Sequence, residues 1–63
     1  MNMRSTGTTG TIIRSTTLHE SPNGRVTGHL PEGTRVNITA SNGAGWLRIG
    51  QLTGWVIASA VRF

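Results

Sequence analysis

The sequence GHLPEGTRVNITA (residues 28–40) holds the most distinctive turn and the most regular strand pattern of the 63-residue chain. In its centre, Pro31 presets the backbone φ angle for a turn, and Gly33 can adopt the positive φ angle that a tight reversal needs. Beyond the turn, apolar and polar residues alternate with a period of two, which is typical of a strand with one buried face. The stretch therefore predicts strands over residues 25–30 and 34–40, joined by a tight turn. The residues expected on one face of the second strand are Val36, Ile38 and Ala40.

The rest of the chain alternates between short apolar segments and turn-forming residues. No window shows the apolar stripe of a helix, and nine glycines are spread among segments rich in β-branched residues, which favours strands. Further strands are predicted over residues 11–14, 16–19, 46–50 and 54–58. The predicted turns and loops between them are residues 20–24, 41–45 and 51–53. The tail after residue 58 has room for a 3₁₀ turn and a last short strand.

These elements predict an all-β fold, a small β-barrel of five to six short strands. Closing the sheet on itself removes the exposed edges that would otherwise pair with other chains. Residues 1–9 are rich in Gly, Thr and Ser and lack a periodic apolar pattern, so we expect a flexible lead-in there and one domain over residues 10–63. The predicted core consists of Ile12, Leu18, Val26, Leu30, Val36, Ile38, Leu47, Ile49, Val56 and Val61.

The charge composition narrows the classes of partner. All six basic residues are arginines and the only acidic residues are Glu20 and Glu32, so the formal net charge is +4. Excess positive charge favours anionic partners, although arginines dispersed along a chain are more typical of a charge that keeps a small domain soluble. The chain has no cysteine, which excludes disulfides and thiolate metal sites. Its two histidines, His19 and His29, come without a carboxylate cluster, so we expect no metal site and no cofactor.

The sequence also argues against catalysis and membrane insertion. It contains no aspartate, its two glutamates lie far apart, and no phosphate-binding loop is present. So short a chain has difficulty building a pocket that excludes water, and we expect it not to be an enzyme. No apolar run approaches the roughly 18 residues of a membrane-spanning helix, so we expect no insertion into a membrane.

One face of the predicted strand over residues 46–50 carries a tryptophan and an arginine. Leu47 and Ile49 share one face of this strand, and Trp46 and Arg48 share the other, because side chains alternate along a strand. Since Ile49 is expected in the core, Trp46 is expected on the outside beside Arg48.

The second tryptophan, Trp55, lies in the predicted strand over residues 54–58. Here the alternation leaves two arrangements open: either Val56 points inward, or Trp55 and Ile57 do. In the first arrangement the indole is available for contact with a ligand, and in the second it fills the core.

The order and spacing of these segments resemble the bacterial SH3 (SH3b) domain family. The most specific segments are GHLPEGTRV (residues 28–36) and GWV (residues 54–56), and the resemblance covers residues 10–61. The other matching segments are GTI (10–12), TTLHESP (16–22) and GWLRI (45–49). The chain departs from the family pattern at His19, where an arginine is usual, at Glu20-Ser21, where Ser-Gly is usual, and in a shorter hairpin between the tryptophan strands. These departures fall in loops and bear on ligand preference more than on fold.

The resemblance implies an SH3-like β-barrel with Val56 in the core and Trp55 in or beside a surface groove. It also implies that the loop beginning at His19 and Glu20 corresponds to the RT loop, which borders the groove of SH3 domains. The candidate ligand-binding residues are Trp46, Trp55, Arg48, His19, Glu20 and Asn42, the last on the opposite loop. For each of them the alternative is an ordinary core, strand or loop position.

By this resemblance, the chain is expected to be a non-catalytic binding module of a bacterial or phage protein, located in the cell envelope or secreted. Its expected partners are peptidoglycan or its stem peptides, and a linked catalytic or envelope domain, with the module itself monomeric. The alternative is a protein–protein interaction module that binds an extended peptide or packs on a neighbouring domain. A third and less favoured function is nucleic-acid binding, because two tryptophans and scattered arginines make a poor stacking platform.

Overall fold

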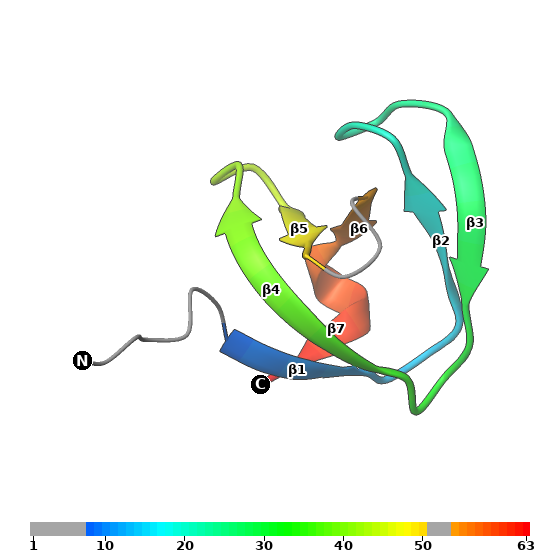
Figure 1. Cartoon of the computed structure of the whole chain (residues 1–63), viewed down its shortest axis with the longest axis vertical. Helices are drawn as coiled ribbons and strands as arrows, with labels where there is room; N and C mark the ends of the chain where they lie inside the picture. Colours follow the sequence, from blue (N-terminus) through cyan, green and yellow to red (C-terminus); the bar gives the residue numbers. More distant parts are fainter. Residues whose placement is uncertain (1–7, 51–53) are drawn as a thin grey trace.

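A computed structural model describes residues 8–50 and 54–63, which form seven strands and one short 3₁₀ helix (Figure 1). The strands are β1 (Thr8–Ile12), β2 (Thr16–His19), β3 (Val26–Leu30), β4 (Arg35–Ser41), β5 (Trp46–Ile49), β6 (Gly54–Ile57) and β7 (Val61–Arg62). The 3₁₀ helix η1 (Ala58–Ala60) connects β6 to β7. The predicted 3₁₀ turn and last strand at the end of the chain are therefore confirmed.

The strands pair in the order β3-β2-β6-β5-β4-β1-β7, and every pair is antiparallel. They curve around a common interior, with the β2–β3 hairpin on one side and β1, β4 and β7 on the other (Figure 1). This arrangement confirms the predicted all-β, SH3-like fold, with seven strands among the described residues where five to six were predicted.

The start of the first strand differs from its prediction. The strand expected over residues 11–14 is β1, which begins at Thr8 and ends at Ile12. Thr8 and Thr9 pair with Ile38 and Asn37 of β4. Most of the predicted lead-in over residues 1–9 lies outside the described residues, and so does the whole predicted turn over residues 51–53. The domain boundary therefore stays a prediction.

The turn between β3 and β4 has the geometry that its sequence predicts. Gly33 has a φ angle of 91°, and the backbone N–H and side-chain hydroxyl of Thr34 both donate to the carbonyl of Pro31, at 3.2 and 2.7 Å. The turn is also joined to β1, because Gly33 N–H donates to Ile12 O at 2.7 Å and Ile12 N–H donates to Thr34 O at 2.8 Å. This stretch therefore fixes both the reversal and its attachment to the first strand.

The barrel interior is apolar and agrees closely with the predicted core. Ile12, Ile49 and Val56 are fully buried. The buried apolar residues of the described part of the chain are Ile12, Leu18, Leu30, Val36, Ile38, Leu47, Ile49, Val56, Ala60 and Val61. Of the predicted core residues only Val26 is absent, and Ala60 is an addition.

The prediction for Val26 is wrong because β3 contains a β-bulge. Leu18 pairs with Gly28, but the next residue of β2, His19, pairs with Val26, so Thr27 is an extra residue in β3. One extra residue reverses the inward–outward alternation beyond it. Val26 therefore lies on the same side as His19 and is 52% exposed.

A second bulge corrects the expected alternation in β4. Ile38 pairs with Ile49, whereas Ala40 pairs with Arg48, so Thr39 is the extra residue. Val36 and Ile38 point inward as predicted, and Ala40 is exposed instead.

Gly54, the residue before Trp55, is required by close packing. A Cβ atom at this position would lie 2.6 Å from Leu18 Cδ1 and 3.1 Å from the carbonyl oxygen of His19. Only a residue without a side chain lets β6 approach β2 so closely. The glycine therefore sets the place of Trp55 beside His19.

Candidate functional site

One row of residues crosses five strands on the outside of the barrel. Strand pairing aligns Val26 of β3 with His19 of β2, His19 with Trp55 of β6, Trp55 with Arg48 of β5, and Arg48 with Ala40 of β4. We call these five residues the outer row. Val26 and Ala40 belong to it only because of the two bulges.

Both tryptophans lie on the outer side of the sheet. Val56 is fully buried, so its neighbour Trp55 faces outward and is half-buried. Trp46 is also half-buried, next to the buried Leu47. The structure thus selects the arrangement with Val56 inside, which alternation alone left open, and it agrees with the outward position expected for Trp46.

Arg48 is an exposed cation beside Trp55. Strand pairing places the two residues directly opposite each other on β5 and β6. Among residues 8–50 and 54–63, the guanidinium of Arg48 has no hydrogen bond or ion pair. Trp46, Trp55 and Arg48 together form what we call the aromatic site, in which two indoles adjoin a positive charge that no described carboxylate neutralises.

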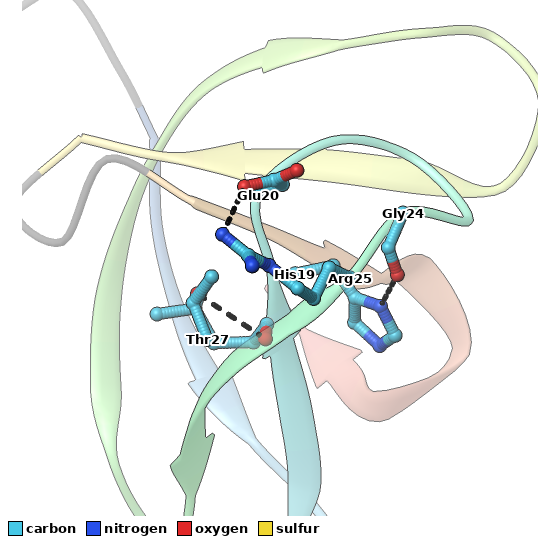
Figure 2. Close-up of polar contacts among 6 residues, drawn as sticks. His19, Glu20, Gly24, Arg25 and Thr27 are labelled. Atoms are coloured by element: carbon cyan, nitrogen blue, oxygen red, sulfur yellow. Dashed lines mark hydrogen bonds and ion pairs between the residues drawn. The ribbon is translucent and has the colours of Figure 1, made fainter.

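His19 connects the aromatic site to the β2–β3 turn. Its ring contacts the indole of Trp46 edge-on, with centroids 4.9 Å apart and planes at 77°. Its Nδ1 is 2.8 Å from the carbonyl oxygen of Gly24 (Figure 2), and its Nε2 is 2.8 Å from Oγ1 of Thr17. Both ring nitrogens of this half-buried residue are therefore engaged within the protein.

Glu20 lies in the turn that follows His19, and its carboxylate pairs with Arg25. Arg25 Nη2 donates to Glu20 Oε1 at 3.4 Å (Figure 2). The two side chains are 77% and 53% exposed, respectively, and a pair so exposed to solvent adds little stability. The backbone holds the turn instead, because Glu20 N–H donates to Arg25 O at 2.9 Å and Gly24 N–H donates to Ser21 O at 2.8 Å. The turn also uses the positive φ angle expected at its Asn-Gly pair, since Asn23 has φ 61°.

Asn42 organises the loop that leads into Trp46. Its side-chain oxygen accepts hydrogen bonds from the backbone N–H groups of Ala44, at 2.8 Å, and Trp46, at 3.1 Å. Its own N–H donates to the carbonyl of Trp46 at 3.1 Å. Asn42 therefore holds the start of β5. Its side-chain oxygen already accepts two hydrogen bonds from backbone N–H groups.

The structure thus brings four of the predicted site residues together: His19, Trp46, Trp55 and Arg48. Glu20 and Asn42 lie on the flanking loops, each bonded within its own loop.

Sequence reasoning missed three neighbours of the site. Thr17 bonds to His19, and a threonine two residues earlier on the same strand face was a usable signal. Ile57 pairs with Trp46 and is 42% exposed, and its outward position follows once Val56 is known to be inside. Val26 had no signal in the sequence, because its exposure depends on the bulge.

The described part of the chain offers a shallow surface and no enclosed site. Residues 8–50 and 54–63 form no pocket. The same residues contain no group of three or more metal-ligating side chains, and none of their helices is long and apolar enough to cross a membrane. The aromatic site can therefore act by surface contact, through stacking on the indoles and pairing with the arginine.

Comparison with known proteins adds one finding. The family model described as "Bacterial SH3 domain" matches residues 9–62. No curated protein and no solved structure matches the chain.

Proposed function

The chain belongs to the bacterial SH3 domain family, whose members are generally binding modules, and on this premise we propose that it binds the bacterial cell wall without catalysis. The ligand is peptidoglycan or its stem peptides. The function implies a location in the bacterial envelope or outside the cell, either as a bacterial or as a phage component. The module acts as a monomer and targets a linked catalytic or envelope domain to the wall.

The observation that carries this proposal is Arg48 beside Trp55, a cation that has no hydrogen bond or ion pair to any described residue. Indole rings offer flat apolar surfaces for sugars and extended peptides, and a guanidinium pairs with a carboxylate through two parallel hydrogen bonds. Stem peptides present free carboxylates on an extended chain. The combination of ring faces and this arginine on one surface fits such a ligand better than a neutral one.

In this proposal Trp46 and Trp55 stack on the ligand and Arg48 binds its carboxylate. His19, Glu20 and Asn42 border the contact surface through the two flanking loops. Because the surface is small and residues 8–50 and 54–63 form no pocket, a single module binds weakly. Linkage to a second binding module would raise the retention on a polymeric wall.

Co-sedimentation with purified bacterial sacculi tests this function. The wild-type chain is expected to sediment with sacculi, and Trp46→Ala, Trp55→Ala and Arg48→Gln are each expected to lower the retention about tenfold, as for a residue at the centre of an interface. Arg62→Gln is the matched control, because it removes the same charge from an exposed position on β7. Equal losses for Arg48→Gln and Arg62→Gln would show non-specific charge attraction and would contradict the proposed site.

A second candidate, a protein–protein interaction module, is favoured by the exposed apolar residues next to the aromatic site. Val26 and Ile57 are 52% and 42% exposed, respectively, and pair with His19 and Trp46. Apolar side chains of this kind suit an extended peptide or the surface of a neighbouring domain. Absence of binding to sacculi, together with chemical-shift changes at Val26 and Ile57 on adding a peptide or a neighbouring domain, would support this function instead. A strongly salt-dependent shift of single-stranded nucleic acid in a gel would support nucleic-acid binding, the third function that the sequence suggests.

A further inference from the structure

We propose that His19 is a positioning residue of the aromatic site: its imidazole, held as the Nδ1–H tautomer, orients the Trp46 indole and fixes the adjacent turn over residues 20–25. The consequence for ligand binding rests on the proposed function. The tautomer and the ring orientation do not, and they can be measured without a ligand.

The tautomer follows from the hydrogen-bond partners. Nδ1 lies 2.8 Å from the carbonyl oxygen of Gly24, and a carbonyl oxygen can only accept a hydrogen bond. Nδ1 must therefore carry the hydrogen. In the neutral ring Nε2 then has a lone pair, which accepts the hydroxyl hydrogen of Thr17 across 2.8 Å.

These two hydrogen bonds fix the plane of the ring. They lie on two different atoms of one rigid ring, and they join it to residue 17 of β2 and to residue 24 of the following turn. Rotation about either side-chain torsion would break at least one of them. The imidazole is thus held in one orientation without any ligand.

The fixed imidazole in turn sets the plane of Trp46. The two ring centroids are 4.9 Å apart and the planes meet at 77°, which is a favourable edge-to-face arrangement of aromatic rings. Asn42 in addition holds the backbone of Trp46, because its side-chain oxygen accepts a hydrogen bond from the Trp46 N–H. The indole is thereby presented in a set direction, so less rotamer freedom is lost when a ligand stacks on it.

The same imidazole places the turn beside the aromatic site. Gly24 belongs to the turn closed by the bonds from Glu20 N–H to Arg25 O and from Gly24 N–H to Ser21 O. Its carbonyl bond to His19 anchors that turn to β2 (Figure 2). The role of His19 is therefore to arrange two parts of the contact surface, with no ring nitrogen left for the ligand.

The tautomer is tested by long-range ¹⁵N–¹H nuclear magnetic resonance on the full chain, at a pH where the ring is neutral. The expected spectrum has the hydrogen of His19 on Nδ1, whereas an isolated histidine favours Nε2. A His19 ring protonated mainly on Nε2 would overturn the proposal.

The variants His19→Asn, His19→Gln and His19→Phe separate the contacts of the ring. Asparagine keeps a donor near the Gly24 carbonyl, glutamine keeps a polar group near Thr17, and phenylalanine keeps only the ring. We expect the indole N–H resonance of Trp46 to shift in all three variants, because asparagine and glutamine remove the edge-on ring and phenylalanine leaves its ring without the two hydrogen bonds that orient it. We also expect sacculus retention to fall at least about threefold in each variant, because each one loses at least one of the two hydrogen bonds of the ring.

Thr17→Val provides a test that leaves His19 itself unchanged. It removes only the partner of Nε2 and is expected to move the Trp46 indole resonance. Thr27→Val is the matched control, because Oγ1 of Thr27 bonds to the carbonyl of Leu18 and not to the ring. An unmoved Trp46 resonance in both Thr17→Val and His19→Phe would overturn the proposal. Loss of sacculus binding by the wild-type chain would remove the proposed function, while the ligand-free spectra still decide the role of His19.

Discussion

At the scale of single residues, the orientation of Trp46 depends on two polar neighbours. Asn42 binds its backbone N–H at 3.1 Å and His19 packs edge-on against its indole. Neither neighbour contributes to the apolar core. Their function is to hold an aromatic ring at the surface. A ring that packs against the protein on one side only is otherwise free to change rotamer.

The acceptor role of Asn42 gives a prediction. Asn42→Ala removes the oxygen that binds the N–H groups of Ala44 and Trp46 and is expected to cost about 1 kcal/mol, because these exposed N–H groups can turn to water instead. Asn42→Asp keeps an acceptor oxygen and is expected to restore most of the loss. Urea unfolding followed by tryptophan fluorescence measures both. Equal destabilisation by the two variants would show that the acceptor oxygen is not what matters.

At the scale of elements, two β-bulges determine which side chains surround the aromatic site. Thr27 in β3 and Thr39 in β4 are the extra residues. Each reverses the alternation beyond it, so that Val26 and Ala40 join His19, Trp55 and Arg48 in the outer row. The outer row consequently runs across five strands, and the aromatic site lies on two of them.

The close approach of β2 and β6 gives a second prediction. Gly54→Ala would place a Cβ 2.6 Å from Leu18 Cδ1, and overpacking of this kind costs about 1–3 kcal/mol. Gly28→Ala is the control on β3, because its Cβ would meet Leu18 at an ordinary 3.5 Å. We expect the control to change the free energy of unfolding by less than about 0.5 kcal/mol.

Thermal and urea unfolding of the two glycine variants provide the measurement. The Trp55 resonances report whether β6 has moved away from His19. A Gly54→Ala variant as stable as wild type, with unshifted Trp55 resonances, would contradict the packing argument.

Strand positions were largely predictable because apolar alternation and turn residues are local signals. The predicted strand over residues 34–40 is β4 (Arg35–Ser41), and the turn at Gly33 has the expected positive φ angle. The faces of Val26 and Ala40 were not predictable. A bulge is a mismatch between two paired strands. The sequence of one strand alone therefore does not predict it, either for β3 against β2 or for β4 against β5.

At the scale of the whole molecule, the chain is a small basic barrel with a shallow contact surface. Its formal net charge is +4, and the described residues form no pocket. A surface of this kind gains specificity from a few anchors and gains little affinity from buried area. Repetition or linkage is the efficient way for such a module to hold a polymer.

Avidity therefore gives the prediction at this scale. Two copies of the chain joined by a flexible linker are expected to be retained on sacculi at least about a hundredfold more strongly than one copy, because the second contact becomes intramolecular. The matched control carries Trp55→Ala in one of the two copies and should behave like a single copy. Co-sedimentation over a range of concentrations measures the difference, and a tandem chain no better retained than one copy would argue against repeated sites on the wall.

The sequence by itself determined the all-β class, the turn at Pro31–Gly33, most of the core and the outward face of Trp46, because these depend on local backbone preference and on alternation within one strand. Only the tertiary structure decided the face of Trp55, the exposure of Val26 and Ala40, and the engagement of both nitrogens of His19. Each of these depends on a partner in another segment: the packing of Val56 into a shared core, the register between paired strands, and the carbonyl of Gly24 brought back by a turn. Contacts between segments are set by the folded sheet as a whole, and no single stretch of the chain contains them.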